Sequence, residues 1–110
     1  MDKLTRYREI VQQVLTDYSR RRSDSEVESQ TLFDTKHDHY QIVNVGWSND
    51  RRVYGCAFHL DIKNEKIWLQ HNATEIDIAE QLMDLGVPRS DIVLGFLPPY
   101  RRQMSDYAVS

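Results

Sequence analysis

The hydrophobic positions of the first segment recur every three or four residues, which is the spacing of one face of an α-helix. They are Leu4, Tyr7, Val11, Val14, Leu15 and Tyr18. Charged and polar residues fill most of the positions between them, so one side of the segment should face a core and the other should face water. The pattern predicts an amphipathic helix at the N-terminus.

From Glu26 onward the period changes to two, which is typical of β-strands. Four such runs follow, and they cover residues 27–34, 39–47, 52–63 and 66–71. The links after the second and third runs centre on Asn49-Asp50 and Asn64-Glu65, and tight hairpin turns favour such pairs. Because short links join antiparallel neighbours, the pattern predicts a four-stranded antiparallel meander.

A second helix is predicted after the meander. Thr74 is a candidate N-cap, and Gly86 marks the stop with Pro88 just beyond it. The apolar residues of one side are Ile76, Ala79, Leu82 and Met83. A short strand-like run then ends at Pro98-Pro99. The chain of 110 residues is therefore expected to form one α+β domain over residues 1–110.

Two-residue hairpin turns would fix which residues lie opposite each other in the sheet. Val43 would lie opposite Cys56, and Gln41 would lie opposite Phe58. One face then collects most of the apolar residues and is the predicted core face: Val43, Val45, Tyr54, Cys56, Phe58, Leu60, Ile62, Ile67 and Leu69. On this face Cys56 is expected to be a small buried hydrophobe rather than a nucleophile.

The opposite face of the predicted sheet mixes small residues, two large aromatics and a few polar residues. Its members are Tyr40, Ile42, Asn44, Gly46, Val53, Gly55, Ala57, His59, Trp68 and Gln70. A face in contact with water would carry more charge, so we expect partial covering by the C-terminal run or by another chain. The alternative is an ordinary solvated face with scattered apolar residues.

Composition narrows the class of protein. The formal net charge is −3, which argues against a protein that chiefly coats nucleic acid. Cys56 is the only cysteine, so no intrachain disulfide can form and a cytoplasmic location is expected. No apolar run approaches the length of a membrane span.

Histidines are the residues that could bind a metal ion. The predicted register places His59 on one face and His39 and His71 on the other, with the latter two ~12 Å apart. Only His37 and His39 could then share an ion, and two ligands make a poor site. No motif for nucleophilic or metal-assisted catalysis is present. We therefore expect no metal, no cofactor and no enzymatic activity.

Arginines offer a second kind of site. Arg51, Arg52, Arg101 and Arg102, with Tyr54 and Tyr100 beside them, could form a basic and aromatic patch for nucleic acid. The alternative, favoured by the acidic total, is that they are solvated loop ends.

Several stretches resemble the cyanobacterial fdxN element excision controlling factors, the XisI-like proteins. They run over nearly the whole chain with the same spacing: "MDKLTRYREIVQ", "FDTKHDHYQIVNVGW", "RRVYGCAFHLDIKNEKIWLQ", "TEIDIAEQLMDLGVPRSDIVLGF" and "PPYRRQMSDYAV". The resemblance implies an α+β fold with a helix and an antiparallel meander. It also implies a role in controlling the excision of a DNA element during heterocyst differentiation. The sequence departs from the family pattern at two places. Asn64-Glu65 stands where the family has Asp-Gly, and Pro98-Pro99 contains an extra proline.

The resemblance also implies a partner. Family members are usually encoded beside XisH, whose fold is similar to that of restriction-type nucleases. We therefore predict a non-enzymatic regulatory protein that binds an XisH-like partner, with a homodimer also plausible. The predicted contact residues are Tyr40, His59, Trp68, Tyr100, Arg101, Arg102 and Tyr107. Two alternatives stay open, namely a DNA-binding accessory factor that uses Arg51, Arg52, Arg101 and Arg102, and an antitoxin that inhibits the nuclease-like partner.

Overall fold

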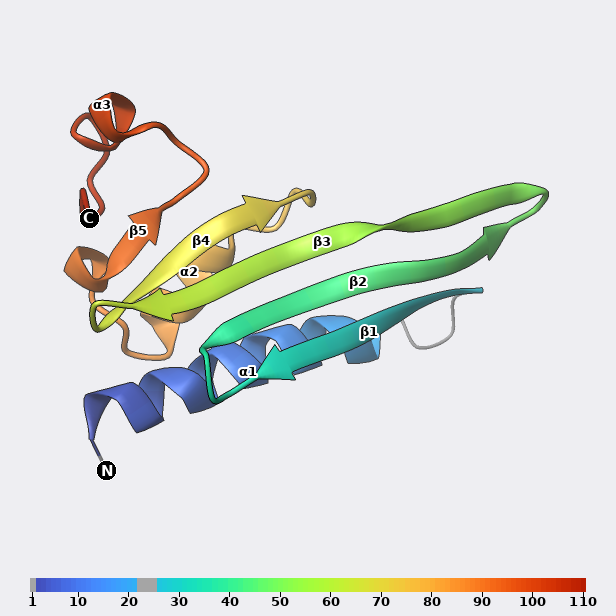
Figure 1. The fold of residues 1–110 in the computed structure, drawn as a ribbon, viewed down its shortest axis with the longest axis horizontal. Coiled ribbons are helices and arrows are strands. Elements are labelled where there is room, and N and C mark those ends of the chain that lie inside the picture. Colours follow the sequence, from blue (N-terminus) through green and yellow to red (C-terminus); the bar gives the residue numbers. More distant parts are fainter. Residues whose placement is uncertain (1, 22–25) are drawn as a thin grey trace.

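The computed structural model describes residues 2–21 and 26–110, which form an α+β fold, as predicted. Helix α1 precedes four strands that pair in chain order, and a short fifth strand follows the second helix (Figure 1). The elements are α1 (Lys3–Arg21), β1 (Val27–Asp34), β2 (His39–Ser48), β3 (Arg51–Lys63), β4 (Lys66–Asn72), α2 (Ile78–Asp84), the 3-10 turn η1 (Arg89–Asp91), β5 (Ile92–Leu94) and α3 (Pro99–Arg102).

The strands β1 to β4 form the antiparallel meander that the sequence predicts, and β5 adds to its end in parallel with β4. Both predicted two-residue turns are present. Asn64 and Glu65 have φ angles of 54° and 62°, which is the geometry of a type I′ turn. The N-cap of α2 is Asp77 and not Thr74, because the Asp77 carboxylate accepts the backbone N–H of Glu80.

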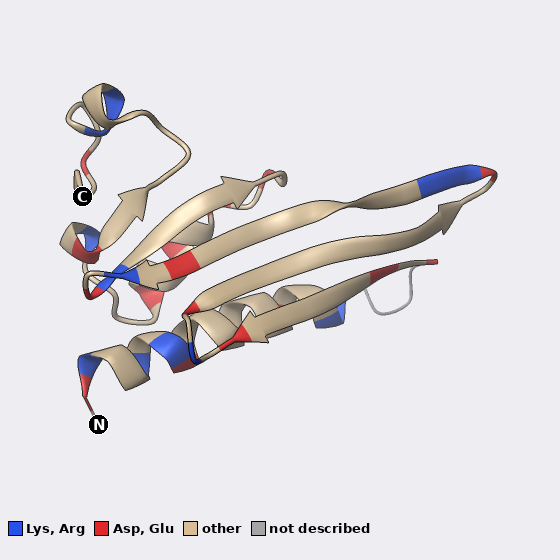
Figure 2. Ribbon diagram, viewed as in Figure 1, with Lys and Arg blue, Asp and Glu red and all other residues tan. Residues whose placement is uncertain are grey.

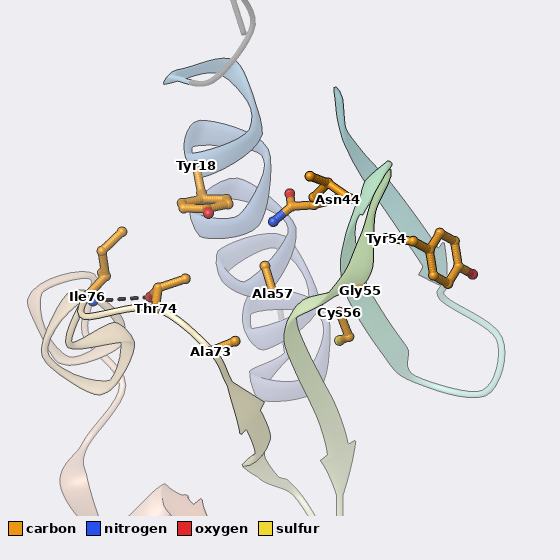
Figure 3. Close-up of a pocket in the computed structure, with 10 residues that line it drawn as sticks. Tyr18, Asn44, Tyr54, Gly55, Cys56, Ala57, Ala73, Thr74 and Ile76 are labelled. Atoms are coloured by element: carbon orange, nitrogen blue, oxygen red, sulfur yellow. Dashed lines mark hydrogen bonds between the residues drawn. The ribbon is translucent and has the colours of Figure 1, made fainter. Parts of the chain in front are cut away.

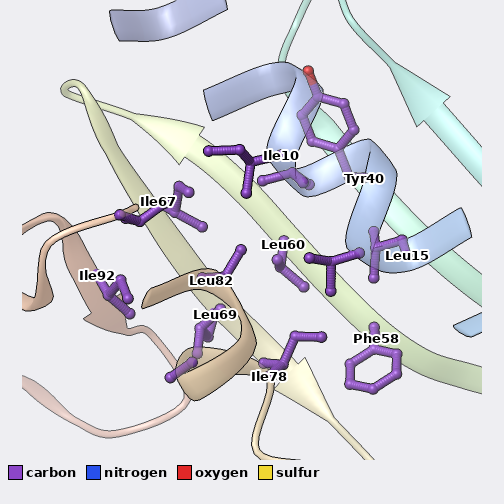
Figure 4. Packing of buried hydrophobic residues seen from close by; sticks show 14 of the residues in the cluster. Ile10, Leu15, Tyr40, Phe58, Leu60, Ile67, Leu69, Ile78, Leu82 and Ile92 are labelled. Atoms are coloured by element: carbon purple, nitrogen blue, oxygen red, sulfur yellow. The ribbon is translucent and has the colours of Figure 1, made fainter. Parts of the chain in front are cut away.

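The core lies between the sheet and the two helices α1 and α2, which pack on the same face. We call this the inner face of the sheet and the opposite one the outer face. Figure 4 shows side chains of α1, of α2 and of the strands meeting in one layer. Phe58, Leu60 and Ile67 are fully buried there, and burial of such a side chain contributes about 1.5–3 kcal/mol.

A β-bulge in β3 changes which residues reach this core. Val43 lies opposite Cys56 as predicted, but Ile42 lies opposite Phe58, so Ala57 has no residue opposite it. The predicted pairing of Gln41 with Phe58 is wrong, since Gln41 lies opposite His59. A bulge residue shifts the alternation of side chains by one position, and the two ends of β3 therefore follow opposite patterns.

The consequences for the predicted faces are large. Tyr40 was assigned to the outer face, but it is fully buried in the core. Tyr54 was assigned to the core, yet 72% of its surface is exposed. Cys56, also assigned to the core, is only half-buried. The predictions for Phe58 and Leu60 hold, because both residues alternate regularly along β3 with Ile62, which the turn at Asn64-Glu65 places opposite Ile67.

Helix α1 is attached to the sheet at the turn between β1 and β2. The Arg8 guanidinium donates two hydrogen bonds to the Asp38 carboxylate, at 2.8 and 3.1 Å, and the buried Tyr40 hydroxyl donates a third at 2.9 Å. The hydrogen bonds from Arg8 hold the pKa of Asp38 below its usual value. Asp38 adopts a left-handed backbone conformation with φ 61°, which Asp tolerates better than most residues.

Candidate functional site

The outer face of the sheet is the face that α1 and α2 do not cover (Figure 1). In Figure 1 the strands β1 to β4 lie in front of α1 and α2, and no other described segment passes in front of them. Large apolar side chains are exposed on β1, β2 and β3: Leu32 (48%), Trp47 (55%) and Tyr54 (72%). Trp47 and Tyr54 lie near the tip of the β2–β3 hairpin, whereas Leu32 lies farther along the face, opposite Gln41. Exposed aromatic residues are typical of surfaces that bind other proteins.

A polar cluster lies on the same face, nearer the β1–β2 turn. His39 on β2 lies opposite Asp61 on β3, and His59 precedes Asp61 by two residues, so all three side chains share a side. The distance from Asp61 Oδ1 to His39 Nδ1 is 2.8 Å, and to His59 Nε2 it is 2.9 Å. Gln70 donates to the other carboxylate oxygen of Asp61 at 3.1 Å. We call His39, His59 and Asp61 the outer-face triad.

Within the outer-face triad, the pKa shifts of Asp61 and His39 both favour the charged form of the group. Partial burial raises the pKa of Asp61, but hydrogen bonds with His39, His59 and Gln70, together with the charge of His59, outweigh burial and leave the pKa below its usual value. The hydrogen bond and the charge of Asp61 raise the pKa of His39. An imidazolium at position 39 and a carboxylate at position 61 are therefore favoured together.

The predicted placement of His39 and His59 on opposite faces of the sheet is wrong. His39 and His59 were assigned to opposite faces, but the bulge at Ala57 brings both to the outer face. One ligand atom from each member of the outer-face triad lies within 4.8 Å of the others, so these residues could hold a metal ion. The sequence does show that His59 and Asp61 share a strand face, but it gives no clear signal for the bulge that adds His39.

Several of the predicted contact residues are buried or half-buried in the structure. Trp68 lies on the outer face but is only 7% exposed, because Arg102 stacks 5.1 Å from its ring centre and Lys63 lies 4.6 Å from it. Its indole N–H has no hydrogen-bond partner among the described residues. Tyr107 is half-buried against the core. Trp68, Arg102 and Tyr107 therefore attach the C-terminal segment to the sheet.

The other predicted contact residues are accessible. Tyr100 is 70% exposed on α3, and Arg101 beside it is exposed as well. His59 is half-buried within the outer-face triad. Together with the buried Tyr40, these positions show that the predicted set does not form one continuous surface.

The arginines of the predicted nucleic-acid patch do not come together. Arg51 and Arg52 lie at the tip of the β2–β3 hairpin, whereas Arg101 and Arg102 lie on α3, at the opposite end of the molecule (Figure 2). Arg52 stacks on Trp47 at 5.5 Å. The four residues therefore form two separate basic patches.

A pocket of about 440 Å³ lies on the inner face, where the β2–β3 hairpin passes the end of α1. Figure 3 shows Tyr18 of α1, Asn44 of β2 and Thr74 of the loop before α2 around it. Cys56 also lines the pocket, and its thiol donates to the carbonyl of Phe58 at 3.1 Å. Burial raises the pKa of the thiol, so Cys56 is protonated near neutral pH and is not an activated nucleophile.

Comparison with known proteins identifies the family. The family described as XisI protein matches residues 1–109. The chain belongs to the XisI family. A crystal structure of a XisI-like protein from Anabaena variabilis ATCC 29413 is 50% identical with a TM-score of 0.90, and the match covers 97% of this chain and 99% of that one.

A second solved XisI structure is also similar. It is the fdxN element excision controlling factor XisI from Anabaena variabilis ATCC 29413, with 32% identity and a TM-score of 0.84 over 99% of this chain and 100% of that one. A search of curated proteins found no match. Among the described residues of this XisI family member, no helix is long and apolar enough to cross a membrane.

Proposed function

We propose that this XisI-family protein is a non-enzymatic accessory protein in the control of DNA element excision, and that it acts by binding a nuclease-like protein of the XisH type. The family match supports the genetic role, because one similar structure is that of an fdxN element excision controlling factor. The XisH-type partner, and action by binding to it, go beyond what the family match supports.

The observation that carries the proposal is the exposed apolar surface on the outer face. Leu32, Trp47 and Tyr54 come from three adjacent strands, and the rigid sheet holds them in fixed relative positions. Aromatic residues contribute much of the binding energy at protein interfaces, and a pre-ordered surface loses little entropy on binding. We expect the partner to cover this face, with His59 at its border.

The described residues favour binding over catalysis. The Cys56 thiol is protonated and donates to a carbonyl, and Asp61 is held by two imidazoles and an amide. Tyr7 and Tyr40 donate their hydroxyls to carboxylates, and their pKa values are raised by burial, in the case of Tyr7 to about 12. None of these groups is an activated nucleophile near neutral pH.

The test is co-expression of this chain with an XisH-type protein, followed by co-purification. Tyr54→Ala should weaken the complex at least about tenfold, as loss of a central interface aromatic does. Leu85→Ala is a control, because Leu85 is an exposed apolar residue at the end of α2, in the helical layer. Tyr100→Ala, with a nearly equal exposed area, asks whether α3 takes part. Absence of a complex between two folded proteins would refute the proposal.

An antitoxin role shares this interface and differs in its consequence for the cell. If the XisH-type partner is a toxic nuclease, its expression alone should slow growth and co-expression of this chain should restore it. The Tyr54→Ala variant should then restore growth less well than Leu85→Ala. Normal growth with the partner alone would remove the antitoxin role and leave the binding proposal in place.

Direct DNA binding is the second candidate, supported by the exposed pair Arg51 and Arg52 at the hairpin tip. Because phosphate contacts release counterions, binding should weaken steeply as salt rises. A mobility-shift titration of Arg51→Ala/Arg52→Ala against Arg101→Ala/Arg102→Ala would show which of the two basic patches contributes. Binding that is absent at low salt would exclude this candidate.

A further inference from the structure

The outer-face triad combines two imidazoles and one carboxylate on adjacent strands. His39 is contributed by β2, and His59 and Asp61 are contributed by β3. We propose that this triad binds a divalent transition-metal ion of the zinc class. This inference goes beyond the proposed function and does not depend on the identity of a partner.

The distances are close to those that a zinc ion needs. Zinc lies about 2.0–2.2 Å from nitrogen and oxygen ligands, so neighbouring ligand atoms in a tetrahedral site are about 3.3 Å apart. Here Asp61 Oδ1 lies 2.8 Å from His39 Nδ1 and 2.9 Å from His59 Nε2, and all three atoms fall within 4.8 Å of one another. Small rotations of the side chains would open enough space for the ion. The ion would replace the two protons that these hydrogen bonds use.

Neighbouring side chains hold the ligands in place. Gln70 donates to Asp61 Oδ2 at 3.1 Å, which leaves Oδ1 turned toward the two imidazoles. The backbone of Gly95 packs closely on Gln70, since a β-carbon at Gly95 would lie 2.6 Å from the Gln70 side-chain oxygen. Hydrogen bonds of this kind orient metal ligands and raise affinity.

Gln41 can support the second imidazole. Its amide nitrogen lies 3.3 Å from His59 Nδ1. A metal ion on Nε2 requires the tautomer that carries its proton on Nδ1, and this proton needs an acceptor. Rotation of the Gln41 amide by half a turn presents its oxygen to that proton, as carbonyl groups commonly do for metal-bound histidines.

The chemistry of the ligands selects the class of ion. Two imidazoles and a carboxylate suit zinc and its transition-metal neighbours, whereas calcium and magnesium prefer oxygen ligands alone. The His39 side chain is 57% exposed, so the remaining coordination positions face solvent. Water, or a side chain of a bound protein, can complete the coordination there.

The chain contains its own control for a histidine–carboxylate pair without a third ligand. His37 Nδ1 lies 2.8 Å from Asp34 Oδ2 in the β1–β2 turn, at the same distance as in the His39–Asp61 pair. Among the described residues no further metal-ligating side chain completes this pair into a group of three. If the outer-face triad binds the ion, substitution of its histidines should lower the zinc affinity, and substitution of His37 should not.

The test is titration of the chelator-treated, tag-free chain with zinc sulfate. Binding is measured by isothermal titration calorimetry and by the shift in melting temperature. We expect one ion per chain. His59→Gln and Asp61→Asn should each lower the affinity by more than about 100-fold, and Gln70→Leu by about 10-fold or more. His37→Gln should leave it unchanged. His39→Gln alters an exposed side chain, so it tests the site even if a β3 variant fails to fold.

Two results would overturn the proposal. One is a wild-type chain that takes up no zinc at concentrations where a His-rich peptide does. The other is a wild-type affinity that His37→Gln weakens as much as His59→Gln, which would indicate adventitious binding to surface histidines. Circular dichroism of each variant establishes that the fold is retained.

Discussion

The two ends of the β2–β3 hairpin differ in what their faces contact. At the end near the Asn64-Glu65 turn, Phe58 and Leu60 lie under α1 and α2, and the outer face carries the polar triad. At the other end, the hairpin extends past α1 and carries exposed Trp47 and Tyr54 (Figure 1). Both ends have alternating apolar residues. The difference shows that alternating apolar residues indicate that one face of a strand is apolar. They do not indicate whether the helices will cover that face.

The largest effect should come from a change in the covered end. Phe58→Ala removes a buried ring that packs edge-on against Tyr18 at 5.0 Å, and it should lower the free energy of unfolding by about 3–5 kcal/mol. Tyr54→Ala, in the exposed end, should change it by less than about 0.5 kcal/mol. Urea denaturation of both variants measures the contrast. Equal losses would mean that Tyr54 is buried in solution.

The next effect concerns the attachment of α1. Asp38→Ala leaves the buried Tyr40 hydroxyl and the Arg8 guanidinium without their acceptor, so we expect a loss of about 2–3 kcal/mol at neutral pH. Because Arg8 lowers the pKa of Asp38, the stabilisation is complete above the unfolded pKa of about 3.9 and disappears as pH falls through the lower folded value. The difference between wild type and Asp38→Ala should therefore shrink below about pH 4. A difference that persists in acid would contradict the ionic origin.

These contrasts indicate what the sequence alone could predict. The α+β class and the elements through β4 follow from the hydrophobic period and the turn residues, because those signals are local, whereas the family follows only from the resemblance of long stretches of sequence. The side of Phe58 was also predictable, since the Asn64-Glu65 turn lies on the same side of the bulge. The burial of Tyr40 and the position of His39 beside His59 depend on one unpaired residue, Ala57, whose side chain gives no local signal.

A smaller effect should distinguish two glycines in the exposed end. A β-carbon at Gly46 would lie 2.7 Å from the Glu26 carbonyl oxygen and 2.9 Å from the Val27 α-carbon, so Gly46→Ala should destabilise by about 1–2 kcal/mol. At Gly55 a β-carbon would meet no described atom within 4 Å, and Gly55→Ala should be neutral or stabilise by up to about 1 kcal/mol. Thermal unfolding of the pair provides the measurement. A similar loss at both positions would show that the hairpin is covered on its inner face.

The smallest effect concerns the turn at the covered end. Glu65 has φ 62°, a conformation that costs a residue with a β-carbon about 1–2 kcal/mol. Glu65→Gly removes this cost but adds freedom to the unfolded chain, so a net gain of about 1 kcal/mol is expected. Asp50→Gly is the matched control in the other turn, where only Asn49 has positive φ. Denaturation of both variants should show a gain at position 65 alone.

The bulge at Ala57 also sets how the length of this chain can vary among relatives. One residue inserted in β3 directly after Ala57 would turn His59 and Asp61 away from His39, which β2 contributes, and would move Phe58 and Leu60 to the outer face. Residues added in pairs, one on each side of Asn49-Asp50, would lengthen the exposed tip and leave every face unchanged. We therefore expect homologues to keep a constant spacing from residue 57 to residue 72 and to differ in length at the hairpin tip.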